Sequence, residues 1–284
     1  MPGAVDIRPL RDGDVVAAEE VSATAVYGSA VDRSAALVLR GRARIRHLAD
    51  TDPGGAWIAE AGGRIVGVAL GLVREGIWGL SLLAVDEAHH GRGIGRRLLH
   101  AAWEHGRDAD GHIVLSSTHP AAIRGYAALG LELRLCVAAA GIVDRDRIPR
   151  VDGVEDSGGA GIATADAIGR AVRGAGHGRD LPTLLDHAGT RLLVFEDRAF
   201  AVLRGAHVAL LGALDEDAAC RVLWGAFAAT APGATAEVEF LTAGQDWAVR
   251  TCLRAGLALS PDGPVFTGGR LGPLRPYVPS GAYL

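Results

Sequence analysis

The fold is decided by residues 82–99, which read LLAVDEAHHGRGIGRRLL. A short apolar strand leads into a glycine-rich turn, and the turn opens directly into an amphipathic helix. Such a turn can aim several backbone N–H groups, together with the positive end of the helix dipole, at one point. Glycine also lets an anionic oxygen approach the main chain closely. The stretch therefore predicts a pyrophosphate or phosphate site, with Arg92, Arg96 and Arg97 adding positive charge around it.

The spacing of the glycines narrows the kind of phosphate ligand. They stand at positions 91, 93 and 95, which fits neither a GxxxxGK[ST] phosphate loop nor a GxGxxG dinucleotide turn. The chain contains no lysine, so mechanisms that need one, such as a Schiff base, are excluded. The same spacing disfavours a generic nucleotide binder.

Composition indicates an ordinary globular protein. The 284 residues are 49% hydrophobic and 22% charged, a length that favours two modest domains over one large domain. A net charge of -4 gives no reason to expect nucleic acid as a partner. No apolar run reaches the roughly 18 to 20 residues that span a bilayer, and the first residues lack the apolar core of a secretion signal. A cytoplasmic protein without a membrane partner is expected.

Cysteine and histidine spacing predicts no metal site. Cys136, Cys220 and Cys252 are widely separated and form no CxxC pair. The histidines form no HExxH motif. We expect the three cysteines to be small buried apolar residues.

The order of predicted elements indicates an α/β fold with a mixed sheet. In the first half we expect strands at 4–9, 57–60, 65–73, 77–85, 112–117 and 131–143, and helices at 12–26, 35–49, 94–105 and 120–129. In the second half we expect helices at 164–173, 180–187, 216–230 and 246–255, and strands at 191–196, 199–203, 208–214, 236–241 and 265–271. Residues 145–161 are polar and glycine-rich, which is typical of a linker. The expected domains are therefore residues 1–144 and residues 162–284, joined by the linker 145–161.

The two halves repeat each other. Residues 118–131 line up with residues 244–257, and the Asp-Glu pair at 86–87 lines up with the pair at 215–216. Between that pair and the core of the next helix, the second copy is about five residues shorter, and the missing piece is the glycine turn. Cys252 stands where the first copy has Tyr126. The halves should share a fold, with chemistry kept only in the first.

Two motifs in the first half resemble the GCN5-related N-acetyltransferase (GNAT) superfamily. Residues 90–95, HGRGIG, resemble its pyrophosphate loop Q/R-x-x-G-x-G/A, with His90 where Gln or Arg is usual. Residues 119–131, HPAAIRGYAALGL, resemble its tyrosine-bearing helix with a leucine-glycine turn, with Leu131 where phenylalanine is usual. The likeness covers residues 4–143. The second half, ending in residues 268–284, resembles the degenerate companion domain of two-domain members, so the expected architecture is a tandem of two GNAT-like domains.

The resemblance implies an acyl-CoA co-substrate, expected to be acetyl-CoA, and no metal. The resemblance places this co-substrate in a V-shaped opening between the strands at 77–85 and 112–117. The residues implied in pairing with its pantetheine arm are Leu83, Ala84 and Val85. Those implied in holding its pyrophosphate are His90, Gly91, Arg92, Gly93, Ile94, Gly95 and Arg96.

The resemblance also implies a reaction, in which an amine attacks the thioester directly and Tyr126 donates a proton or a hydrogen bond to the departing thiolate. For the base, Glu75 and His119 are candidates, and a water chain or the carboxylate of Leu284 stays open. The acceptor is a small-molecule amine, an amino-sugar antibiotic or a peptide N-terminus. The second half either walls the acceptor pocket or is purely structural, and a homodimer stays open. The alternative function is a non-catalytic acyl-CoA-binding or sensing module.

Overall fold

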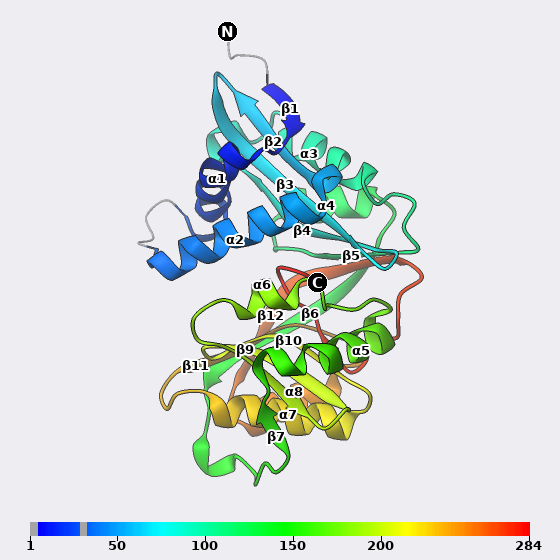
Figure 1. Cartoon of the computed structure of the whole chain (residues 1–284). Helices are drawn as coiled ribbons and strands as arrows, with labels where there is room; N and C mark the ends of the chain where they lie inside the picture. Colours follow the sequence, from blue (N-terminus) through cyan, green and yellow to red (C-terminus); the bar gives the residue numbers. More distant parts are fainter. Residues whose placement is uncertain (1–4, 29–32) are drawn as a thin grey trace. The chain divides into compact units, whose positions relative to one another are not determined.

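The computed structural model describes residues 5–28 and 33–284, and its contacts divide the chain into two compact units. The first unit holds residues up to Asp110, and the second runs from Gly111 to Tyr283 (Figure 1). Both mix strands and helices, which confirms the predicted α/β class.

The first unit is an antiparallel meander in the order β1-β2-β3-β4, with helices packed on it. Its strands are β1 Val5–Pro9, β2 Ala56–Ala61, β3 Arg64–Arg74 and β4 Ile77–Val85. Its helices are α1 Val15–Tyr27, α2 Ala35–Thr51 and α3 Ile94–Glu104, with short turns η1 Asp12–Asp14, η2 Pro53–Gly55 and η3 Glu87–His89. The predicted strand at 77–85 is confirmed to the residue.

Local sequence explains these elements. The two residues between β2 and β3, Gly62 and Gly63, have φ of 57° and 76°, which a tight hairpin turn needs. Ser34 caps α2, because its hydroxyl accepts a hydrogen bond from the Leu37 N–H (3.3 Å). Residues 66–72 of β3 are all buried, so both faces of this sheet are covered. Both α1 and α3 contact β3.

The second unit contains a longer sheet, in the order β5-β12-β6-β11-β10-β9-β8-β7, and β13 pairs with β10. The strands are β5 Gly111–Leu115, β6 Glu132–Ile142, β7 Val154–Asp156, β8 Thr190–Phe195, β9 Ala199–Arg204, β10 His207–Ala213, β11 Thr235–Thr242, β12 Ala258–Gly269 and β13 Tyr277–Val278. The helices are α4 Pro120–Ala128, α5 Ile162–Arg173, α6 Leu181–Leu185, α7 Glu216–Ala229 and α8 Asp246–Arg254, with short turns η4 Arg145–Arg147 and η5 Gly158–Gly161. Its core gathers side chains of α7, α8 and the strands β8 to β11.

The sequence repeat appears in the order of the elements. The meander β7-β8-β9-β10 follows the same antiparallel pattern as β1-β2-β3-β4, and in each repeat a helix, a strand, a helix and a last strand come next. The last strands are exchanged: β12 of the second repeat lies between β5 and β6 of the first, and β6 pairs with β11 of the second.

This exchange explains why the compact units differ from the domains expected at 1–144 and 162–284. Because β5 and β6 pair with β12, the end of the first repeat folds with the second.

The segment expected to be a linker, residues 145–161, is not wholly irregular, since it contains β7, whose residues 154–156 pair with β8. Only three residues of β7 enter the sheet, which is too short a pattern to distinguish from a polar connection in the sequence.

No helix in the described part of the chain is long and apolar enough to cross a membrane.

Candidate active site

The glycine turn between β4 and α3 forms as the sequence predicts. The carboxylate of Asp86 accepts a hydrogen bond from the Ala88 N–H (2.8 Å) and so starts the turn. Gly91 and Gly93 both have φ of 74°, and Gly93 is the N-cap of α3. A Cβ atom at either glycine would meet no other atom within 4 Å. The space beside the main chain is therefore open to a ligand.

The N-terminus of α3 offers a cluster of unused donors. Its first hydrogen bond runs from the Arg97 N–H to the Gly93 carbonyl (3.2 Å). Within residues 5–28 and 33–284, the N–H groups of residues 91–96 donate to no backbone acceptor. These donors and the helix dipole both favour an anion at this end of the helix.

Basic side chains surround the turn. The ring Nε2 of His90 lies 2.9 Å from the carbonyl oxygen of Val85, so this ring holds the turn against the end of β4. Arg92 donates to the Ala88 carbonyl (3.3 Å), and Arg97 donates to the Val5 carbonyl (3.0 Å). Beside the turn, an open groove of about 500 Å³ is lined by Ile7, Arg96, Arg97 and His100. The whole region suits a ligand with several negative charges.

The strand edge expected to hold pantetheine belongs to β4, the last strand of the first meander. Leu83, Ala84 and Val85 pair on one side with Ala69, Val68 and Gly67 of β3. Ser81 is an extra residue in β4, since Leu70 pairs with Leu82 and Gly71 pairs with Leu80. Such a bulge bends a strand and increases its local twist.

Tyr126 lies on α4 in the second unit and is nearly fully buried. Its ring packs edge-on against Phe266, with 5.6 Å between the ring centroids. Burial raises the pKa of the hydroxyl to about 12, so it stays protonated at neutral pH. Within residues 5–28 and 33–284 this hydroxyl makes no hydrogen bond, which leaves it available as a donor.

His119 is the N-cap of α4, and Pro120 is the first residue of that helix. The Nδ1 atom of His119 accepts a hydrogen bond from the Ala121 N–H (3.2 Å). A nitrogen that accepts this hydrogen bond cannot also take a proton from a substrate without breaking the cap. The contact gives His119 a structural role and weighs against its use as a base.

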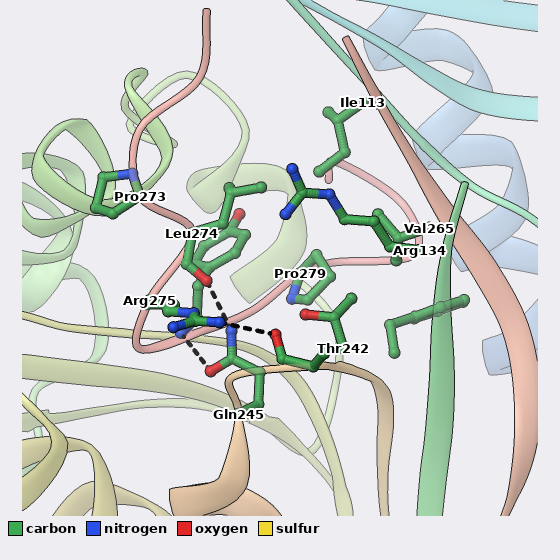
Figure 2. A pocket seen from close by; sticks show the side chains of 12 residues that line it. Ile113, Arg134, Thr242, Gln245, Val265, Pro273, Leu274, Arg275 and Pro279 are labelled. Carbon is green, nitrogen blue, oxygen red and sulfur yellow. Dashed lines mark hydrogen bonds between the residues drawn. The ribbon is translucent and has the colours of Figure 1, made fainter. Parts of the chain in front are cut away.

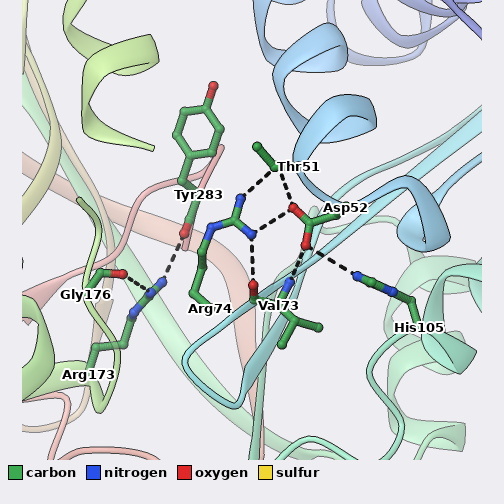
Figure 3. A network of polar contacts seen from close by, with 8 residues as sticks. All are labelled: Thr51, Asp52, Val73, Arg74, His105, Arg173, Gly176 and Tyr283. Carbon is green, nitrogen blue, oxygen red and sulfur yellow. Dashed lines mark hydrogen bonds and ion pairs between the residues drawn. The ribbon is translucent and has the colours of Figure 1, made fainter. Parts of the chain in front are cut away.

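Glu75 lies in the exposed turn between β3 and β4, with φ of 47°. Eight residues of extended chain separate it from Leu83, which is roughly 26 Å. A glutamate side chain reaches only a few ångströms, so Glu75 is far from the edge expected to hold pantetheine. The residue before it, Arg74, is buried in an ion pair with Asp52 (2.8 Å), shown in Figure 3.

No metal site is evident in the described ranges, where no three His, Cys, Asp or Glu side chains gather in a suitable way. Cys136 and Cys252 are buried free thiols, and burial raises the pKa of each, to about 11 and about 12. Cys220 is a half-buried free thiol.

Residues 28–131 match the family model described as the acetyltransferase (GNAT) family. The matched segment includes both the glycine turn and the tyrosine-bearing helix. The chain therefore carries a GNAT-family domain. This family consists of acyl-CoA-dependent acyltransferases.

Solved structures extend the likeness in fold to the whole chain. A putative acetyltransferase from Pyrococcus horikoshii has a TM-score of 0.81 at 18% identity, with 99% of this chain and 96% of that chain covered. A GCN5-related N-acetyltransferase from Sphaerobacter thermophilus has a TM-score of 0.58 at 17% identity, covering 93% and 95%. Another from Kribbella flavida has a TM-score of 0.60 at 17% identity, covering 94% and 72%. No curated protein sequence matches the chain significantly.

One residue of the GNAT domain that the sequence reasoning missed is Arg44 on α2. Its Nε donates to the Ser81 hydroxyl (2.8 Å), and its guanidinium also bonds the Ser81 carbonyl. Arg44 therefore secures the bulge of β4, two residues before Leu83. The signal was the run RGRARIR at 40–46, in which every second residue is arginine. A charge run of this kind does not reveal which arginine turns toward the sheet.

Proposed function

We propose that the protein transfers an acetyl group from acetyl-CoA to an amine. The observation that carries the proposal is the turn at residues 90–96, with open space at two glycines and unused N–H groups at the start of α3. These donors suit the pyrophosphate of CoA, and the surrounding arginines suit its charge.

In this proposal the main chain of residues 83–85 holds the pantetheine arm in the manner of an added strand. Such pairing orients the thioester, so that binding energy is used to position the reacting carbonyl. Arg44 acts at a distance from the ligand, by keeping the bulge at Ser81 in place.

The reaction proposed is a direct attack. The amine nitrogen forms a bond to the thioester carbonyl carbon, the C–S bond then breaks, and the products are an amide and a thiolate. Tyr126 donates a hydrogen bond to that thiolate. An ordinary thiol has a pKa of about 8.5, below the value of about 12 for Tyr126, so hydrogen bonding is favoured over full proton transfer.

The amine must lose a proton during the attack. Since His119 uses Nδ1 as a helix cap and Glu75 lies in the turn before β4, far from residues 83–85, we propose that water carries this proton away. The acceptor proposed is a small amine or a peptide N-terminus.

The second candidate is a non-catalytic acyl-CoA sensor, and one observation favours it: β4, with sequence IWGLSLLAV, contains no acidic residue. The experiment that separates the two is a broad amine screen with acetyl-CoA, following release of free thiol. Amine-dependent thiol release supports the transferase. Tight acetyl-CoA binding without thiol release across the whole screen would favour the sensor, and absence of any CoA binding would contradict both.

A further inference from the structure

The C-terminal segment of residues 274–280 lies along β10 of the second unit. Its strand β13 is antiparallel to β10, with Val278 opposite Leu211 and Tyr277 opposite Gly212. The Ala213 N–H also donates to the carbonyl of Pro276 (3.2 Å). The segment therefore adds a short strand to β10.

The other side of the segment is bonded to the loop before α8. The side chain of Gln245 accepts from the Tyr277 N–H (3.3 Å) and donates to the Leu274 carbonyl (2.7 Å). Arg275 donates to the Ala243 carbonyl (3.3 Å). Figure 2 shows Arg275 beside the bond between Gln245 and Leu274. β10 and β11 are parallel and pair at a single position, His207 with Glu237, so the segment fills the space where the two strands diverge.

The occupied edge corresponds to the edge proposed for pantetheine in the first repeat. Since the Asp-Glu pair at 86–87 matches the pair at 215–216, residues 82–84 of β4 correspond to residues 211–213 of β10. Each strand carries one extra residue near this edge, Ser81 in β4 and Ala209 in β10. The segment thus binds β10 where the first repeat is expected to bind its cofactor, a comparison that rests on the proposed function.

The rest of this second cleft suits a peptide and not a phosphate ligand. The N-terminus of α7 is already capped by Asp215, whose carboxylate accepts from the Ala218 N–H (2.9 Å). Glu216 and Asp217 add acidic charge in the same turn, where the first repeat has glycines and arginines. A cavity of only about 20 Å³ is left beside the segment, enough for one water molecule.

We propose that residues 274–280 are the resident ligand of the second repeat, bound by strand addition in a cleft that has lost its cofactor. Tyr277 anchors the ligand. Its ring stacks on His177, and its hydroxyl lies 2.9 Å from the His177 Nε2, with both side chains buried. Pro276 and Pro279 on either side limit the pairing to two residues.

The test separates the segment from its cleft. The chain ending at Pro273 is mixed with a synthetic peptide of residues 274–284, and thermal unfolding and calorimetry are measured. We expect the shortened chain to melt at a lower temperature and the peptide to restore it with saturable, one-to-one binding. A peptide of the same composition in scrambled order, and the peptide with Tyr277→Ala, should bind at least tenfold more weakly.

A second form of the protein covers the case in which the shortened chain does not fold. A protease recognition sequence inserted at the exposed Pro273 allows the full chain to fold before it is cut. The released peptide should then stay with the protein through gel filtration. Loss of the peptide without any change in melting temperature would overturn the proposal.

Acetyl-CoA titration provides the decisive contrast. The intact and the peptide-free protein should bind the same number of acetyl-CoA molecules, namely one per chain. A second acetyl-CoA site that appears only without the peptide would show that the segment masks a cofactor site, which contradicts the proposal. Absence of acetyl-CoA binding to the intact chain would sink the proposed function and leave the peptide measurement valid.

Discussion

At the scale of single residues, Tyr126 and Asp52 show how burial acts on two different groups. Burial raises the pKa of the Tyr126 hydroxyl to about 12 and keeps it a donor. Desolvation would also raise the pKa of Asp52, but hydrogen bonds from His105, Thr51, the Val73 N–H and Arg74 outweigh it and lower the value to about 2 (Figure 3). The Tyr126 hydroxyl is thus held neutral, and the Asp52 carboxylate is held charged.

We expect Tyr126→Phe to lower turnover by about 10²- to 10³-fold, the usual cost of removing one hydrogen-bond donor from a developing negative charge. Acetyl-CoA affinity should change little, because the lost hydroxyl is not part of the phosphate turn. Steady-state kinetics measure the turnover, and calorimetry measures the acetyl-CoA affinity. The matched control is Tyr283→Phe, a buried tyrosine in the second unit. Near wild-type turnover in Tyr126→Phe would make Tyr126 a packing residue.

Replacing Asp52 with Asn should destabilise the first unit by about 3 kcal/mol at pH 7, because it leaves the buried Arg74 without its counter-charge. The folded-state pKa of Asp52 lies below its unfolded value of 3.8, so the stability from this carboxylate is fully present above pH 3.8. It is lost as the pH falls toward 2. Urea unfolding of both proteins at pH 7 and near pH 2.5 should therefore show a difference that shrinks in acid.

The control for this prediction is Asp108→Asn, which removes a fully exposed carboxylate of the same unit. It should change stability by less than about 0.5 kcal/mol at either pH. An Asp52→Asn protein as stable as the wild type at pH 7 would show that the buried pair contributes nothing.

At the scale of elements, the turn between β4 and α3 combines glycines of positive φ with helix N–H groups that donate to no backbone acceptor. Only glycine takes φ of 74° without strain, and here it does so at two positions that face open space. A side chain at either position would lie beside the N–H groups of α3. A bulky side chain in the turn should therefore block access of a ligand to these N–H groups, although the turn is exposed.

We expect Gly93→Val to weaken acetyl-CoA binding at least tenfold. The control is Gly62→Val in the β2–β3 turn, since Gly62 also has positive φ (57°) and no atom within 4 Å of a Cβ. Both substitutions impose backbone strain of about 1 to 2 kcal/mol, so thermal unfolding should report similar losses. Calorimetry should show weaker acetyl-CoA binding only for Gly93→Val. Equal acetyl-CoA affinity in the two variants would show that the turn does not bind the cofactor.

At the scale of the whole molecule, the exchange of β6 and β12 decides what can fold alone. Within the second unit, β12 pairs on one side with β5 and on the other with β6. A chain cut between the repeats would expose the edges of β5 and β6, and unpaired strand edges promote aggregation.

Residues 1–144 expressed alone should therefore aggregate or lack cooperative unfolding. Co-expression with residues 145–284 should restore a soluble complex that elutes as one species and unfolds cooperatively. Gel filtration and circular dichroism are the measurements. A monomeric 1–144 fragment with a sharp unfolding transition would contradict the importance of the exchange.

The sequence alone determined the fold class, the strand at 77–85, the glycine turn and the repeat, because each rests on local periodicity or on residues close together in the chain. It also placed Tyr126 correctly on a helix. Local patterns could not reveal that Arg44 turns toward Ser81, and they left open whether His119 acts as a base or caps the helix. Both depend on side-chain directions that a charge run or a lone histidine leaves open.

Only the tertiary structure decided how the repeats are divided and where the C-terminal segment lies. A strand carries the same alternating pattern whether it pairs within its own repeat or with the other, so the sequence could not predict that β12 joins β5 and β6. For the same reason residues 274–280 give no sign in the sequence that they pair with β10, while β7 resembles a linker because only three of its residues enter the sheet. Partner choice between distant strands is set by packing of the whole sheet, and that information is not local.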